Sequence, residues 1–127
     1  MSFSDFWETE ILDHVFGIGS YTAPSTYVGL STANPLDDAS ALAEPAAGAY
    51  ARVEVTAWSR SGSEVDNDSA ITFPTATDSW GTVTYGCLFD ADSSGNLLLS
   101  FALDASKAVV NGDTVNFAAG QFNVTLD

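Results

Sequence analysis

The segment DADSSG, residues 90–95, carries the side chains best suited to binding a metal ion. Its Asp, Asp, Ser and Gly match the first, third, fifth and sixth positions of a calcium-binding loop. The twelfth position of such a loop should be a bidentate glutamate, but here it is Phe101. The flanking segments, TVTYGCLF and NLLLSFAL, have strand-like composition, whereas an EF-hand needs a helix on each side. The sequence therefore predicts the tip of a β-hairpin and no metal site.

Calcium binding through Asp90 and Asp92 stays as the alternative reading of this segment. A second acidic cluster, EVDNDS at 64–69, would add ligands if the fold brought it close. Asp, Ser, Gly and Asn are also the residues that a tight turn requires, so composition alone does not separate the two readings.

Side chains that serve in nucleophilic or acid–base catalysis are few. His14 is the single histidine and Cys87 the single cysteine, the latter in an apolar stretch typical of a small buried residue. The sequence contains no nucleophile-elbow, phosphate-loop or dinucleotide-binding motif. A carboxylate pair of the kind used by glycosidases is harder to exclude among seventeen acidic residues. We predict that the chain is not an enzyme, with no catalytic residues and no cofactor, and keep a hydrolase of cell-wall sugars as the least favoured class.

One helix is expected at residues 2–16, before any strand. Apolar side chains recur in it at spacings of three and four, and Gly17 follows as a natural end. Aromatic side chains are favoured anchors in protein interfaces. Either this stripe folds back onto the domain's own core or it packs against a neighbouring chain, so its members are candidate subunit-interface residues: Phe3, Phe6, Trp7 and Ile11.

After the helix the pattern changes to short alternating segments separated by turn residues. Candidate strands lie at 26–32, 50–58, 69–74, 81–89, 96–103, 107–110, 113–117 and 120–126, and SRSGSEVDND between the second and third of these reads as a loop. The dipeptide Asn111-Gly112 predicts a type I′ hairpin between 107–110 and 113–117. The fold class is therefore mainly β: an antiparallel β-sandwich, or a partly closed jelly-roll-like barrel, of seven to eight strands. We expect a single domain over 1–127, with the sandwich at 26–126 behind the helix.

The charge balance restricts the possible partners. Three basic and seventeen acidic residues give a net charge of −14, which repels nucleic acid and anionic lipid. No apolar run approaches the length of a membrane span, and the acidic N-terminus does not resemble a signal peptide. We expect no nucleic-acid or membrane partner, and synthesis in the cytoplasm.

Nearly the whole chain resembles a family of small tailed-phage structural proteins, often labelled phage tail fiber protein or gp80-like. The resemblance rests, in order, on LDHVFGIGSYTAPSTYVGLSTANPLDD, GAYARVEVT, NDSAITFPTATDSWGTVTYGCLFDADSSGNLLLSFAL and VVNGDTVNFAAGQFNVTLD. The resemblance implies a virion component and carries over no catalytic residues.

Within a virion, the strong negative charge favours an outward-facing position, away from packaged DNA. We expect a decoration (cement) protein on the outer capsid surface, bound to the major capsid protein and to itself as a homo-oligomer, with a trimer favoured. The alternative is a tail or tail-fibre-associated module that contacts host surface glycans through exposed aromatics such as Tyr50, Trp58 or Trp80. Core packing is the competing reading of those three side chains.

Overall fold

A long hairpin forms the centre of the fold. The computed structural model describes residues 1–126 and shows β7 (Gly81–Phe89) antiparallel to β8 (Leu97–Val109), with Phe89 opposite Leu97 and Gly81 opposite Val109. Both strands are rich in the β-branched, aromatic and aliphatic residues that suit a half-buried pleated surface. Register shifts near Val83 and Leu88 mark irregularities that bend the pair.

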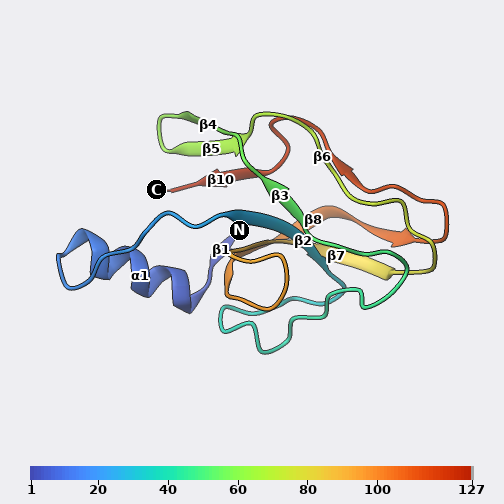
Figure 1. Ribbon diagram of the computed structural model, residues 1–127, viewed down its shortest axis with the longest axis horizontal. Coiled ribbons are helices and arrows are strands. Elements are labelled where there is room, and N and C mark those ends of the chain that lie inside the picture. The colour runs from blue at the N-terminus through green and yellow to red at the C-terminus, as the bar shows by residue number, and fades with distance from the viewer. Residues whose placement is uncertain (127) are drawn as a thin grey trace.

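Three further strands complete a five-stranded sheet around this hairpin, in the order β1-β8-β7-β2-β3. They are β1 (Ser2–Phe3), β2 (Thr26–Ser31) and β3 (Val53–Val55). Every pairing in the sheet is antiparallel. The helix α1 (Asp5–Val15) leaves from the β1 edge and extends away from the strands to one end of the molecule (Figure 1).

Two smaller sheets lie across from the first (Figure 1). One has the order β10-β5-β4, and the other pairs β6 with β9. Their bounds are β4 (Trp58–Ser61), β5 (Glu64–Asn67), β6 (Ile71–Thr72), β9 (Asn116–Phe117) and β10 (Asn123–Thr125).

The core lies between these layers. Fully buried aliphatic residues of the large sheet, such as Val28 and Leu98, meet the aromatic side chains of the opposite side. Phe122 is the centre of this aromatic group, with ring centroids 4.9 Å from Phe101 and 5.8 Å from Phe117, both edge to face. Such pairs add stability beyond the area that they bury. The predicted class, a mainly β sandwich behind an N-terminal helix, is confirmed, and the sheets do not close into a barrel.

The predicted start of the helix was wrong by three residues. Ser2 and Phe3 form a short edge strand against β8, and the helix begins after Ser4, whose hydroxyl accepts a hydrogen bond from the Trp7 amide at 3.2 Å. Ser4 is buried and its amide donates to Leu98 O at 2.8 Å, so the cap is fixed to the sheet. Pairing of Ser2 and Phe3 with β8 therefore outweighs the helical spacing of apolar residues that begins at Phe3.

The strand count was also too low, since the structure has ten strands over residues 1–126. The predicted strand at 50–58 is interrupted after Val55, and the predicted loop at 59–68 contains most of the β4–β5 hairpin. That hairpin turns at Gly62-Ser63, where only Gly62 has a positive φ, as in a type II′ turn.

The predicted hairpin at Asn111-Gly112 was wrong in its pairing. Residues 116–117 pair with β6 and not with the end of β8. Gly112 has φ 93° but Asn111 is not among the residues with positive φ, so the turn is not type I′.

Among residues 1–126, no helix is long and apolar enough to cross a membrane.

Gly29 in β2 provides a direct test of the packing. A Cβ placed there would lie 2.8 Å from Phe89 Cε2, 2.9 Å from the Tyr50 hydroxyl and 3.0 Å from Glu44 Oε1. We expect Gly29→Ala to lower the free energy of unfolding by about 1–3 kcal/mol, measured by urea denaturation, because the closely packed neighbours must shift. Gly19→Ala is the matched control: its nearest contact would be an ordinary 3.5 Å from Asp13 Cβ, and a change below about 1 kcal/mol is expected. Equal effects of the two substitutions would contradict the packing described here.

Candidate functional site

The acidic segment at 90–95 forms the connection between β7 and β8, which confirms the predicted hairpin. Asp90 closes the loop: its Oδ1 accepts from the Asn96 amide at 2.7 Å and its Oδ2 accepts from Asn96 Nδ2 at 2.8 Å. Ser94 and Gly95 have positive φ values of 52° and 67°, which carry the chain back toward β8. Asp90 thus acts as a turn residue that satisfies the loop's own donors.

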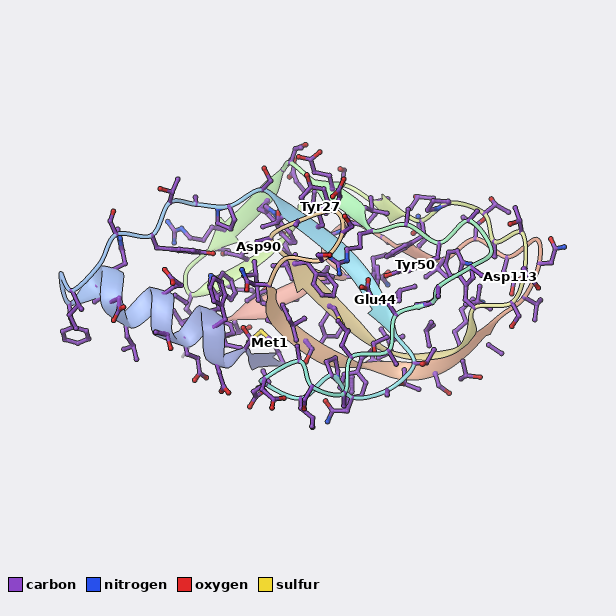
Figure 2. The ribbon with its side chains drawn as sticks, turned by 60° about the horizontal axis from the view of Figure 1, so that its bottom comes forward. Met1, Tyr27, Glu44, Tyr50, Asp90 and Asp113 are labelled. Carbon is purple, nitrogen blue, oxygen red and sulfur yellow. The ribbon has the colours of Figure 1, made fainter. Side chains whose placement is uncertain are left out.

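Arg52 supplies the positive charge beside this loop. Its Nη1 donates to the carbonyl oxygens of Ala91 and Ser94, each at 2.8 Å. Its Nη2 and Nε donate to Glu44 at 2.6 and 3.0 Å, and its guanidinium carbon lies 3.5 Å from the centre of the Phe89 ring. The Arg52 side chain is 6 % exposed, so this is a nearly buried ion pair. Its acidic member, Glu44, lies beside Tyr50 (Figure 2). Two carbonyl groups of the loop are therefore already occupied by a cationic side chain.

In the part of the chain that the structure describes, no three His, Cys, Asp or Glu side chains are grouped as metal ligands. The second acidic cluster, 64–69, lies in and after β5, in a different sheet from the β7–β8 loop.

Asp90→Ala distinguishes a turn residue from a calcium ligand. We expect a loss of about 1 kcal/mol in the free energy of unfolding, because two hydrogen bonds that close the exposed loop are lost. Millimolar calcium should leave the melting temperature of the wild-type protein unchanged. The control is Asp92→Ala, whose carboxylate accepts only from Ser93 Oγ at 3.3 Å, and whose effect should be small. A rise in melting temperature with calcium that Asp90→Ala abolishes would instead establish a metal site.

The single cysteine and the single histidine of the sequence lie on different elements. Cys87 is fully buried in β7 beside Phe89 and Leu97. The pKa of its thiol is raised to about 12, first by burial and then by the Glu44 carboxylate, against a lowering by Arg52. His14 lies exposed in the last turn of α1, where Nδ1 accepts from the Tyr21 amide at 3.2 Å. Neither arrangement resembles an activated nucleophile with its base.

Two of the three aromatics considered for glycan binding are integrated into the body of the protein. Trp80 is 4 % exposed and its Nε1 donates to Gly48 O at 2.8 Å. The Tyr50 hydroxyl donates to Glu44 at 2.7 Å and accepts from the Leu30 amide at 2.9 Å. Core packing therefore describes both residues.

Trp58 is half-buried and lines an apolar groove of about 260 Å³ between α1 and the strands. Its Nε1 donates to the Thr26 hydroxyl at 3.0 Å, and that hydroxyl donates to Val55 O at 3.0 Å. The remaining side chains of the groove are Trp7, Val65, Leu88 and Val124. A sugar needs polar partners for its hydroxyl groups. The two polar groups of this groove, Trp58 Nε1 and the Thr26 hydroxyl, are already hydrogen-bonded to each other.

The four predicted interface residues lie along the face of α1 and β1 that meets the body. Phe3, Phe6 and Trp7 are half-buried and pack against the protein's own core, with the rings of Phe3 and Trp7 4.7 Å apart. Ile11 is half-buried one turn further on. Whether these side chains also contact a neighbouring chain stays a prediction.

The exposed apolar surface of the helix lies beyond them, at its C-terminal end. Four large apolar side chains are 55, 67, 72 and 76 % exposed and form what we call the α1 tip: Leu12, Val15, Phe16 and Ile18. The helix ends in a Schellman motif, in which Gly17 has φ 70° and Ile18 N donates to Asp13 O at 2.9 Å. The tip thus has a defined geometry at one end of the molecule (Figure 1).

Sequence reasoning did not single out the tip. Leu12 and Phe16 were available as a signal: they are four residues apart and lie on a different side of the helix from Trp7 and Ile11. An apolar arc this wide exceeds what one buried face needs.

A comparison with protein-family models gives one match: residues 2–125 match the family described as Podophage GP4 fiber I protein gp80. No curated protein matches the chain.

Proposed function

The chain belongs to the family described as podophage GP4 fiber I protein gp80, and from that premise we propose that it is a decoration protein on the outer surface of the phage head. In this role it works by adhesion: its contacts with the major capsid protein oppose the pressure of packaged DNA. The observation that carries the proposal is the α1 tip, which exposes apolar side chains at one end of the molecule. A contact surface of this kind is expected of a protein that belongs to a family of virion proteins.

Charge supports an outward-facing position. With a net charge of −14, the chain would be repelled by packaged DNA, whereas on the outside it would also keep particles apart in solution. The absence of repeats in its 127 residues suits a compact unit better than the shaft of a long fibre.

A non-enzymatic role is part of the proposal. The family is one of structural fibre proteins, and the buried Cys87 and the exposed His14 belong to different elements. The side chains closest to the acidic loop, Arg52 and Glu44, are engaged in holding it.

A trimer is the assembled form that we propose. A single α1 tip is smaller than the roughly 800 Å² per partner of a stable interface. Three tips acting together would gain avidity without any new kind of contact, and a trimer matches a local three-fold position on a shell. Sedimentation equilibrium of the purified chain tests this part independently.

A tail-fibre module is the second candidate, favoured by the word fiber in the description of the family. Host glycan binding through Tyr50 or Trp80 no longer supports it, since both side chains are engaged within the protein. In this reading the α1 tip would attach the module to the tail.

Locating the chain on intact virions decides between the two candidates. Gold-labelled antibody against the purified chain should cover the heads, with hundreds of copies per particle by quantitative mass spectrometry. Label confined to the tail, with a few dozen copies or fewer, would overturn the decoration proposal and support the fibre module. Virions without the chain would overturn both.

A further inference from the structure

The α1 tip is the main apolar feature that the fold leaves uncovered. Eight large apolar residues of 1–126 are strongly exposed, and four of them fall within residues 12–18. At 55 to 76 % exposure, four such residues present on the order of 500 Å², a patch size that on a monomer is often functional. Ile18 follows the glycine of the Schellman motif and stays 76 % exposed, and Leu12, the apolar residue in position to contact it, stays 55 % exposed.

Acidic side chains border this patch. Glu8 lies one turn before Leu12, and Asp13 lies three residues before Phe16, so both flank the exposed apolar pair. Glu8 is in the first turn, where the helix dipole favours an acid, but Asp13 is near the C-terminus, where the dipole disfavours one. The stability of the helix therefore does not account for Asp13, and a positively charged partner would.

A second copy of the chain offers little of that charge. Each copy carries a net charge of −14 with three basic residues. Arg52 is held in the ion pair with Glu44, so that Arg60 and Lys107 remain, in β4 and β8.

We propose that the α1 tip inserts into an apolar socket on another virion protein, and that lysine and arginine side chains form the rim of this socket. The inference rests on the proposed function, since it names the chemistry of the partner surface. Apolar side chains supply the contact, while Glu8 and Asp13 steer and orient it. The trimer proposed above is then formed through other surfaces.

Salt separates this partner from a second copy. Attraction between an acidic tip and a basic rim weakens as ionic strength rises, whereas screening between two chains of charge −14 strengthens their association. Binding to a basic socket should therefore weaken with added salt, whereas association of two copies of the chain should strengthen.

The test uses virions produced by a phage deleted for this chain, to which the purified chain is added back. We expect saturable binding by co-sedimentation, weaker by about tenfold or more at 500 mM than at 50 mM salt. Leu12→Ser with Phe16→Ser should weaken binding at least about 30-fold, as loss of interface hot spots does. Glu8→Gln with Asp13→Asn should weaken binding at 50 mM salt and flatten the salt dependence.

Val110→Ser with Leu126→Ser is the matched control, since both residues are similarly exposed, at 54 and 61 %, but lie outside the helix. This pair should bind like the wild type. Urea denaturation of every variant identifies any that fail to fold. The inference is overturned if the wild type binds and the Leu12 and Phe16 variant binds equally well. It is also overturned if the wild type self-associates more strongly at high salt through the tip. No binding of the wild-type chain to the deleted virions would instead contradict the proposed function.

Discussion

Replacing Arg52 with alanine is expected to lower the free energy of unfolding by about 3–4 kcal/mol. The substitution leaves Glu44 with only the Tyr50 hydroxyl as a side-chain partner, and the Glu44 side chain is only 20 % exposed. It also frees the carbonyl oxygens of Ala91 and Ser94. Removing one member of a nearly buried ion pair is costly because the remaining charge stays desolvated.

Urea denaturation measures this effect, with Arg60→Ala as the control. Arg60 is exposed and donates to the nearby Gly62 O, so its replacement should change stability by less than about 0.5 kcal/mol. In a double-mutant cycle, the combined loss of Glu44 and Arg52 should cost clearly less than the sum of the single losses. A cost below about 1 kcal/mol for Arg52→Ala would show that the pair does not hold the loop.

The β7–β8 hairpin was predictable from sequence because its signals are local. Apolar strand residues stand on both sides of a loop of Asp, Ser and Gly, and the fold uses them as expected. The pairing of β9 was not predictable in the same way. Asn111-Gly112 is a strong local signal, but Asp113 O accepts from the Ala76 amide at 2.8 Å, which directs the chain toward a segment far away in sequence. A long-range hydrogen bond thus outweighs the preferred turn.

The β4–β5 hairpin was missed for a different reason. Most of its residues are polar, with Trp58 and Val65 as the exceptions, so no regular alternation of apolar and polar side chains marks it. Its position depends on Asn67, whose fully buried amide donates to Ser69 O and Ala118 O and accepts from the Phe122 amide. Such a network becomes visible only in three dimensions.

The candidate site, too, was only partly predictable from sequence. Aromatic residues on the N-terminal helix could be recognised from sequence, but which side of the helix meets the body could not, because both sides carry apolar residues. The partners of Arg52 also lie up to 42 residues away in the chain. Sequence therefore located the helix, whereas its exposed end became visible only in the structure.

Alkaline pH is expected to destabilise the protein by up to about 4 kcal/mol between pH 8 and pH 11. Burial raises the pKa of Cys87 from 9.0 to about 12. Burial also raises the pKa of Tyr50 above its ordinary value of 10.0, and Glu44 adds to the rise against a lowering by the Leu30 amide. Above pH 9 for the thiol, and above pH 10 for the phenol, the unfolded chain loses a proton that the folded chain keeps. Stability is thus intact below pH 9 and then falls by about 1.4 kcal/mol per pH unit for each group.

Urea denaturation at pH 8, 9.5 and 11 measures this fall, and two variants assign it. In Cys87→Ala the decrease should begin only near pH 10, where Tyr50 and the other tyrosines begin to lose their protons in the unfolded chain. In Tyr50→Phe the decrease in stability should still begin near pH 9. Its slope should stay near the value for one proton, about 1.4 kcal/mol per pH unit. Alkylation gives an independent check: iodoacetamide at pH 8.5 should modify Cys87 in urea but not in the folded protein, where the thiol is fully buried. An identical pH dependence in the wild type and Cys87→Ala, or rapid alkylation of the folded chain, would mean that β7 opens to solvent and that the core described here is not closed around Cys87.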